Sequence, residues 1–137
     1  MKIRLLALAI FSFSAFVARA ETVTIDNATL ARLAASGVAV IDVRTEKEWK
    51  ETGVIPGSRL ITYFDANGNS NPAQWLERVK AVSAPGQLVA LVCRSGRRSA
   101  AATQFLAGQA GYKTVYNVGQ GLNGWVAEGR PLIAPPR

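Results

Sequence analysis

Two short apolar runs, each followed by a helix-like segment, constrain the fold of this chain more than any other feature. Residues 38–43 read Val-Ala-Val-Ile-Asp-Val, and residues 88–92 read Leu-Val-Ala-Leu-Val. Such runs of β-branched and aliphatic residues are typical of strands that are buried on both faces of a parallel sheet. We therefore expect buried strands that alternate with covering helices.

The rest of the chain supplies further strands and helices in the same alternating order. Strands are expected at residues 22–25, 38–43, 58–62, 87–92 and 114–118. Helices are expected at residues 26–36, 46–51, 99–110 and 122–128, with one more that begins at Pro72. This order predicts an α/β domain with right-handed crossovers, in which ligands bind beyond the carboxyl ends of the strands.

The segment after the second apolar run carries the candidate chemistry. Cys93 is the only cysteine of the chain and stands where the strand at residues 87–92 should end. The six residues that follow it are Arg94, Ser95, Gly96, Arg97, Arg98 and Ser99. Nearby cations and a helix N-terminus favour the nucleophilic thiolate, and the backbone N–H groups of such a turn can hold an anion. We define residues 93–99 as the cysteine loop and predict that it binds an anionic substrate.

The composition excludes many other kinds of site. The chain has no histidine, which excludes Cys–His proteases, Ser–His–Asp hydrolases and histidine-ligated zinc sites. A single cysteine excludes a C-x-x-C redox pair and a thiolate metal cluster, and no nucleotide or flavin signature is present, so we expect no metal and no cofactor. Nucleophilic chemistry by Cys93 without a dedicated base is still possible. Sulfur transfer is such a reaction, because it needs only a nucleophile that is already ionised. Phosphoryl transfer to cysteine is the rival, since the same loop would fit a phosphate.

The first residues read as a secretory signal peptide. They combine a basic start, an apolar stretch at residues 5–17 and an Ala18-Arg19-Ala20 ending, and the apolar stretch is short for a membrane span. We expect residues 1–20 to be a signal peptide and residues 21–137 to form one domain, exported to the periplasm without stable membrane association. An unpaired cysteine in a compartment where disulfides form favours a functional role for Cys93.

The net charge does not indicate a nucleic-acid partner. The formal charge of +7 falls to about +4 without the predicted signal peptide, and no basic run is interleaved with aromatic residues. The basic residues of the cysteine loop instead predict a small anionic ligand.

Four motifs occur in an order that resembles a single-domain rhodanese. They lie at residues 42–49, 53–58, 93–99 and 121–125, so the resemblance covers most of the chain after the predicted signal peptide. It implies a parallel sheet of about five strands flanked by helices. It also implies transfer of a sulfane sulfur from thiosulfate, or a similar anionic donor, to a thiophilic acceptor through a cysteine persulfide. The acceptor would be a thiol, cyanide or a thioredoxin-like protein.

The resemblance also implies roles for individual residues. Cys93 matches the nucleophile, and residues 94–98 match the substrate loop, whose N–H groups face the sulfur. Ser99 would open the following helix. Asp42 and Arg44 match structural positions, and Glu48 is expected to pair with Arg44.

Further expectations concern the aromatic residues and one departure from the family. Trp125 is expected in the core, and ordinary packing is also expected for Trp49 and Tyr63, although both could line the mouth of the pocket. Val54 stands where the family usually has a histidine, a loss that we take to be minor because that residue is not catalytic in the usual account.

Two alternative functions use the same cysteine. A phosphatase or arsenate-type enzyme needs an arginine six positions after the cysteine, where this chain has Ser99, while Arg98 falls one position short. A sulfur-carrier or redox-partner module would receive a persulfide on Cys93 from another protein without turning over thiosulfate.

Overall fold

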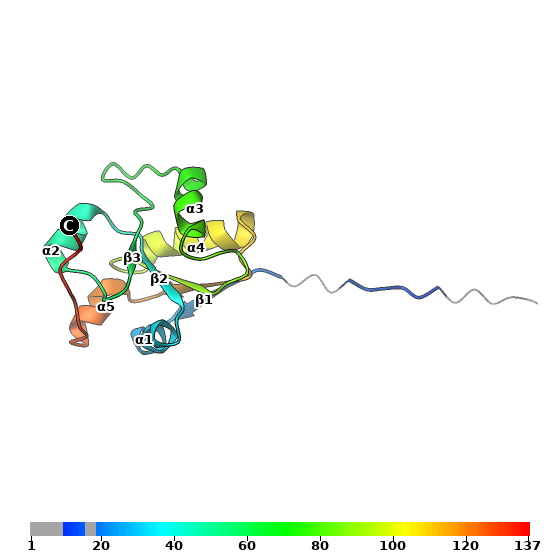
Figure 1. Cartoon of the computed structure of the whole chain (residues 1–137), viewed down its shortest axis with the longest axis horizontal. Helices are drawn as coiled ribbons and strands as arrows, with labels where there is room; N and C mark the ends of the chain where they lie inside the picture. The colour runs from blue at the N-terminus through cyan, green and yellow to red at the C-terminus, as the bar shows by residue number, and fades with distance from the viewer. Residues whose placement is uncertain (1–9, 16–18) are drawn as a thin grey trace, which may run out of the picture.

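A five-stranded, wholly parallel sheet lies at the centre of the computed structural model, which describes residues 10–15 and 19–137 (Figure 1). The strands are β1 (Glu21–Ile25), β2 (Ala39–Asp42), β3 (Arg59–Leu60), β4 (Val89–Val92) and β5 (Thr114–Val118). Their order across the sheet is β1-β5-β4-β2-β3. The predicted α/β fold with about five parallel strands is confirmed.

Helices cover both faces of this sheet. They are α1 (Asn27–Ala35), α2 (Glu46–Thr52), α3 (Pro72–Lys80), α4 (Arg97–Gln109) and α5 (Gly121–Ala127). Apolar residues of α3 and α4 pack into the core on one face, and those of α1 and α5 pack into the core on the other. Figure 1 shows the same division, with α2 beyond one end of the sheet.

Strand β4 holds the central position because every one of its side chains is apolar. Val89 and Leu91 join the core under α3 and α4, whereas Ala90 and Val92 join the core above α1 and α5. All four residues are fully buried. The interpretation of this run as a strand buried on both faces is therefore confirmed, and the residue that follows it emerges at the carboxyl edge of the sheet.

Several element boundaries differ by one or more residues from those predicted, and two of these differences have a clear structural cause. Strand β3 contains two residues rather than the five expected at 58–62, because it pairs only with the end of β2 at the edge of the sheet. Helix α4 begins at Arg97, two residues before Ser99, since Gly96 already acts as its N-cap with a left-handed φ of 88°. Ser99 therefore lies inside the first turn of α4 and does not open the helix.

The C-terminal segment runs back over the domain beside α2. Val54 and Ile133 form an antiparallel bridge with N···O distances of 2.8 and 2.9 Å. The indole of Trp125 donates to the carbonyl of Pro131 at 2.9 Å. Val54 is buried, so the position at which the resembled family usually has a histidine has a packing role in this chain.

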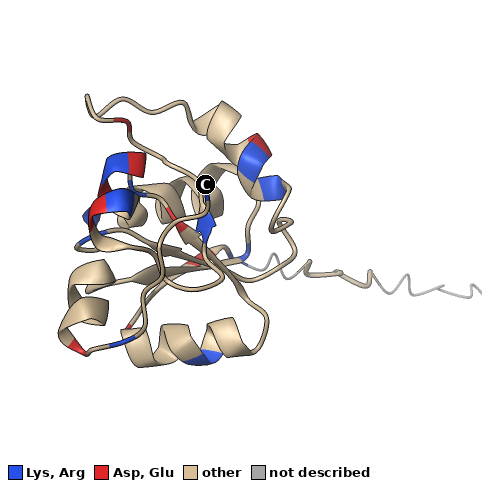
Figure 2. Cartoon of the chain, turned by 60° about the vertical axis from the view of Figure 1, so that its left-hand side comes forward, with Lys and Arg blue, Asp and Glu red and all other residues tan. Residues whose placement is uncertain are grey.

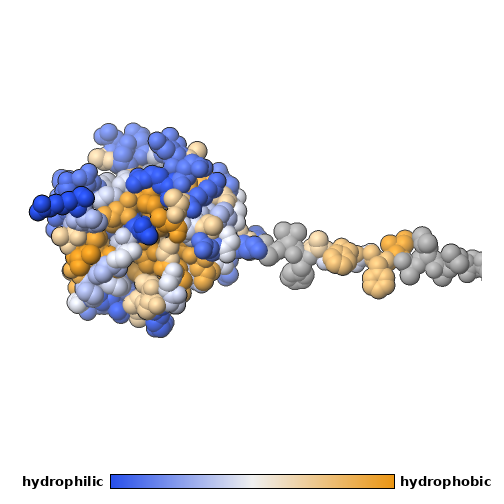
Figure 3. Space-filling view, viewed as in Figure 1, coloured by the Kyte–Doolittle hydropathy of each residue, from blue (hydrophilic) through white to orange (hydrophobic). Residues whose placement is uncertain are grey.

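Part of the predicted signal peptide lies outside the described residues, which begin at 10 and omit 16–18. Residues 10–15 form neither helix nor strand, and their large apolar side chains are exposed and extend away from the domain (Figure 3). Across the described ranges, no helix is long and apolar enough to cross a membrane. The assignment of residues 1–20 as a signal peptide stays a prediction.

Candidate active site

Cys93 lies in the turn that joins the end of β4 to the start of α4, and its side chain is buried with 1% exposure. Two groups of the cysteine loop point at its sulfur. The backbone N–H of Gly96 donates to Sγ at 3.1 Å, and the Ser99 hydroxyl lies 3.3 Å from Sγ. Such donors stabilise a sulfur that carries negative charge.

These donors decide the acidity of the thiol. Burial raises the pKa of Cys93, but hydrogen bonds from the Ser99 hydroxyl and from the N–H groups of Ser99, Ser95 and Gly96 together outweigh it. The net pKa is therefore lower than that of a free thiol. A larger fraction of Cys93 is consequently present as the nucleophilic thiolate near neutral pH.

The start of α5 fixes the cysteine loop from the other side. The N–H groups of Leu122 and Asn123 donate to the carbonyls of Cys93 and Arg94 at 2.8 and 3.0 Å. Gly121 allows this approach, because a Cβ atom there would lie 2.4 Å from the Cys93 carbonyl oxygen. Because α5 binds the carbonyls of Cys93 and Arg94 on one side of the loop, the N–H group of Gly96 can point toward the sulfur on the other side.

The arginines of the cysteine loop divide into two kinds. Arg94 and Arg97 are exposed, and within the described part of the chain neither forms an ion pair. Arg98 instead forms a two-pronged ion pair with Glu48, with N···O distances of 2.6 and 2.8 Å. Arg98 thereby joins α4 to α2, where charges of both signs alternate (Figure 2).

The expected pairing of Glu48 with Arg44 is wrong. Arg44 is buried against the Asp42 carboxylate, with a closest N···O distance of 2.8 Å, and it also donates to the Gly53 carbonyl at 3.0 Å. This pair ties the end of β2 to the end of α2, in line with the structural role expected for both residues. The Arg98 guanidinium holds the pKa of Glu48 down to about 2, against the opposing effect of burial.

A polar pocket of about 480 Å³ opens beside the cysteine loop. Its lining residues are Glu48, Arg94, Ser95, Arg97 and Arg98. The structure thus brings the loop arginines to one pocket, while Gly96 and Ser99 lie buried beside the sulfur. Within the described residues no three His, Cys, Asp or Glu side chains converge on a point where a metal ion would bind.

Asn117 belongs to this site although nothing in the sequence motifs singled it out. It stands on β5 opposite Leu91 of β4, and its side chain reaches the first turn of α4. Its Oδ1 accepts from the Ser99 hydroxyl at 2.6 Å, and its Nδ2 donates to the Gly96 carbonyl at 3.1 Å. The pairing of β5 with β4 was the missing information, since it alone places residue 117 beside the cysteine loop.

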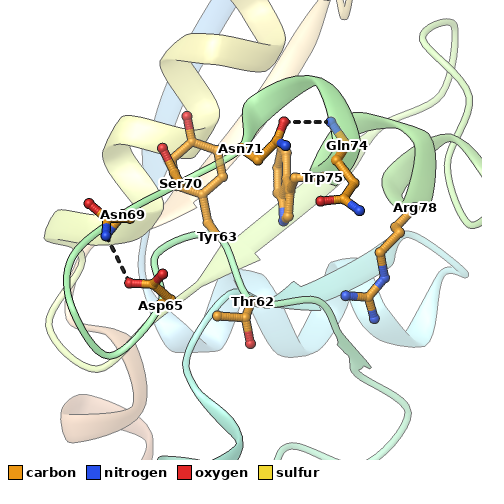
Figure 4. A pocket seen from close by; sticks show the side chains of 9 residues that line it. All are labelled: Thr62, Tyr63, Asp65, Asn69, Ser70, Asn71, Gln74, Trp75 and Arg78. Carbon is orange, nitrogen blue, oxygen red and sulfur yellow. Dashed lines mark hydrogen bonds between the residues drawn. The ribbon is translucent and has the colours of Figure 1, made fainter.

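Two of the three aromatic residues singled out in the sequence pack in the core, and the third, Trp49, is half-buried on α2. Trp125 is buried in the core, as predicted. Tyr63 packs edge-on against Trp75 and Phe64, with ring centroids 4.8 Å apart in both pairs. It also forms a wall of a second pocket, of about 460 Å³, between the loop after β3 and α3 (Figure 4). None of the residues that line this second pocket belongs to the cysteine loop.

Comparison with known sequences identifies relatives along most of the chain. The sequence model of the family described as "Rhodanese-like domain" matches residues 26–128. Thiosulfate sulfurtransferase 18 of Arabidopsis thaliana is 32% identical over 125 residues, which cover 88% of this chain and 90% of the relative. Rhodanese-like domain-containing protein 17 of the same plant is 30% identical over 116 residues, or 82% and 73% of the two chains.

Solved structures show the same similarity. A rhodanese-related protein from Thermoplasma volcanium aligns with a TM-score of 0.63 at 29% identity, covering 82% of this chain and 99% of that chain. A rhodanese-like domain protein from Staphylococcus aureus aligns with a TM-score of 0.58 at 25% identity, covering 82% and 98%. The match over residues 26–128, together with these relatives, shows that the chain belongs to the rhodanese-like domain family.

Proposed function

We propose that this protein is a thiosulfate sulfurtransferase that works through a persulfide on Cys93. Membership of the family and the named sulfurtransferase relative support sulfur transfer in general. The observation that carries the finer proposal is the set of hydrogen-bond donors around a buried sulfur that has no imidazole base beside it. Such a site suits a nucleophile that is already ionised and a leaving group that departs as a stable anion.

The proposed reaction is a nucleophilic transfer of one sulfur atom, and it needs no external oxidant or reductant. The Cys93 thiolate attacks the outer sulfur of thiosulfate, the S–S bond of thiosulfate breaks, and sulfite leaves with the bonding electron pair. The enzyme then carries a persulfide anion, whose terminal sulfur is attacked by a thiophilic acceptor. Transfer of that sulfur returns Cys93 to the thiolate.

The cysteine loop supplies the groups for each step. The N–H groups of Ser95, Gly96 and Ser99 stabilise the thiolate, and they would also stabilise the persulfide that replaces it. Arg94 and Arg97 are free of ion pairs within the described residues and line the pocket, so we assign them the binding of the anionic donor. Arg98 serves mainly to hold the loop against Glu48.

The geometry favours sulfur transfer over phosphoryl transfer. The residue six positions after Cys93 is Ser99, which is buried and bonded to Asn117, so it offers no cation to clamp a phosphate. The Arg98 guanidinium, one position earlier, is already held by Glu48.

The proposed acceptor of the sulfur is a thiol, cyanide or a thioredoxin-like protein.

We also propose that the protein is exported to the periplasm. This proposal of export rests on the sequence of residues 1–20. Mass analysis of the N-terminus of the protein recovered from a periplasmic fraction tests it, and a chain that begins at Glu21 is the expected result. An uncleaved chain in the cytoplasmic fraction would overturn this part.

Intact mass spectrometry tests the reaction itself. The reduced protein should gain the mass of one sulfur atom after thiosulfate is added, and cyanide should then remove it. Cys93→Ala should gain nothing. A confirmed reduced protein that takes up no sulfur would contradict the use of thiosulfate.

Turnover separates an enzyme from a sulfur carrier. With excess thiosulfate and cyanide, we expect many thiocyanate molecules per protein. A single sulfur per protein that is released only to a partner protein would instead identify a carrier module.

A further inference from the structure

The Ser99 hydroxyl lies between two groups that can both use its single proton. Its oxygen is 2.6 Å from Asn117 Oδ1 and 3.3 Å from Cys93 Sγ. A serine hydroxyl donates one hydrogen bond and accepts others, so it can donate to only one of these two groups at a time. Ser99 is fully buried and Asn117 is nearly so, which leaves few alternative partners.

The other end of the Asn117 amide contacts the same turn. Its Nδ2 donates to the carbonyl of Gly96, whose own N–H donates to the Cys93 sulfur. This pairing fixes which way round the amide lies, because the carbonyl of Gly96 can only accept. One side chain from β5 therefore holds two of the groups that surround the sulfur.

We propose that Asn117 is a positioning residue for Cys93, which orients the Ser99 hydroxyl through Oδ1 and the Gly96 peptide through Nδ2. When Cys93 is a thiol, its S–H donates to Ser99 Oγ and Ser99 donates to Asn117. When the thiol releases its proton to water, the Ser99 hydroxyl turns and donates to the thiolate. Asn117 Oδ1 therefore accepts from Ser99 only while Cys93 is a thiol, whereas Nδ2 holds the Gly96 peptide, whose N–H points at the sulfur, in both states.

This proposal deepens the proposed function, because it concerns the same sulfur and is relevant to sulfur transfer. Its test needs no sulfur donor, so it stands or falls independently of thiosulfate. The chain has one cysteine, so the rate of alkylation by iodoacetamide reports on Cys93 alone. The pH at which that rate reaches half its plateau gives the pKa of the thiol.

Four proteins form the test, namely the wild type, Ser99→Ala, Asn117→Ala and the double variant. Ser99→Ala should move the alkylation profile to higher pH and lower the rate about tenfold below the midpoint, since it removes a donor to the thiolate. Asn117→Ala should move the profile in the same direction but less, because it loosens the Gly96 peptide while it frees the Ser99 hydroxyl to donate to the sulfur. In the Ser99→Ala background, Asn117→Ala should produce a larger upward shift than in the wild type, because no hydroxyl is left to be freed for the sulfur. Ser99→Thr, which keeps the hydroxyl, should restore the wild-type profile.

The surrounding charges are the same in all of these variants. They are Arg94, Arg97 and Arg98 of the loop and α4, Glu48 of α2, and the Asp42–Arg44 pair of β2. Thr103→Val is the matched control, since Thr103 is also buried on α4 but bonds only to the carbonyl of Ala100. Its alkylation profile should not move.

Several results would overturn the proposal. One is an Asn117→Ala profile that stays in place or moves to lower pH. Another is a shift in the Ser99→Ala background that is no larger than in the wild type, which would mean that Asn117 does not compete with the sulfur for the Ser99 proton. A loss of thermal stability with an unchanged profile would show a purely structural role. If Asn117→Ala does not fold, Asn117→Thr replaces it with a residue that suits a strand and lacks both amide contacts.

Discussion

At the scale of single residues, the site depends on pairings that cross between elements. Arg98 is the clearest case, because its guanidinium is held by a carboxylate fifty positions earlier in the chain. That carboxylate, Glu48, also accepts from Thr45 in the capping box of α2. The charge of one residue therefore supports both a helix start and the cysteine loop.

Replacement of Glu48 should reveal this link through pH. The pKa of Glu48 is about 2 in the folded protein and 4.5 ordinarily, so its contribution to stability is present above pH 4.5 and is lost as pH falls toward 2. We expect Glu48→Gln to lower the free energy of unfolding by about 1 kcal/mol near pH 7, an estimate reduced for solvent screening. Urea unfolding of the wild type and the variant at several pH values measures this difference.

Two results bear on that prediction. The free energies of unfolding of the wild type and Glu48→Gln should become more similar toward pH 2. A difference between them that stays constant with pH would contradict the role of the ion pair. Glu46→Gln is the control, because Glu46 is an exposed carboxylate on the same helix whose pair with Lys50 lies in solvent.

Loss of Arg44 should be far more damaging than loss of a surface cation. Arg44→Met leaves the buried Asp42 carboxylate without its partner, which we expect to cost about 3–5 kcal/mol. The urea midpoint measures this loss. Lys50→Met should leave the midpoint unchanged, since it breaks only an exposed pair. Equal effects of the two changes would contradict a supporting role for the buried pair.

The residues that carry the site were only partly predictable from sequence. Cys93 and its loop stand together in the chain, so their composition and position were sufficient to locate them. The expected pairing of Glu48 with Arg44 joined two residues that are four positions apart. That spacing implies contact only within a helix, and Arg44 precedes α2. Asn117 could not be found without knowing that β5 lies beside β4.

At the scale of elements, the junction between the cysteine loop and α5 is the most sensitive point. Gly121 has a left-handed φ of 58°, and a Cβ atom there would meet the carbonyl oxygens of Cys93 and Arg94 at 2.4 and 2.6 Å. Both neighbours are backbone atoms, so the whole turn must move to make room. The conformation of the loop thus depends on the absence of one side chain on another element.

Gly121→Ala should therefore lower stability and disturb the site together. We expect a loss of about 2 kcal/mol or more in the free energy of unfolding and a large decrease in the sulfur taken up from thiosulfate. Gly108→Ala is the matched control, because Gly108 lies in α4 with nothing within 4 Å of a new Cβ atom. It should raise stability by about 0.5–1 kcal/mol. If Gly121→Ala matched the wild type in both measurements, the contact would be unimportant.

The sequence predicted the elements well where local signals were strong. The strand at residues 114–118 and the capping box at Thr45 and Glu48 agree with the structure. The start of α4 was placed too late, because Gly96 carries no side chain that would mark it as a cap. Gly96 has a left-handed φ, and a Cβ atom there would also meet the backbone of Gly119, so the position needs glycine for two reasons.

At the scale of the whole molecule, the C-terminal segment acts as a strap. Removal of residues 131–137 deletes the bridge to Val54 and the acceptor of the Trp125 indole. With three hydrogen bonds lost at about 1 kcal/mol each, we expect a decrease of about 3 kcal/mol or less in the free energy of unfolding. Urea unfolding measures it, and a truncation that removes only residues 136–137 is the control. An unchanged urea midpoint after the longer truncation would contradict the role of the strap.

The order of the strands has a consequence for the timing of folding. Strand β1 opens the domain, yet among the residues that the structure describes it pairs only with β5, near the opposite end of the sequence. During synthesis, β1 must wait unpaired until β5 has left the ribosome, because loop closure over that distance cannot happen sooner. The sheet is therefore completed only once almost the entire polypeptide has been made, and until then the nascent chain exposes a strand that chaperones can bind.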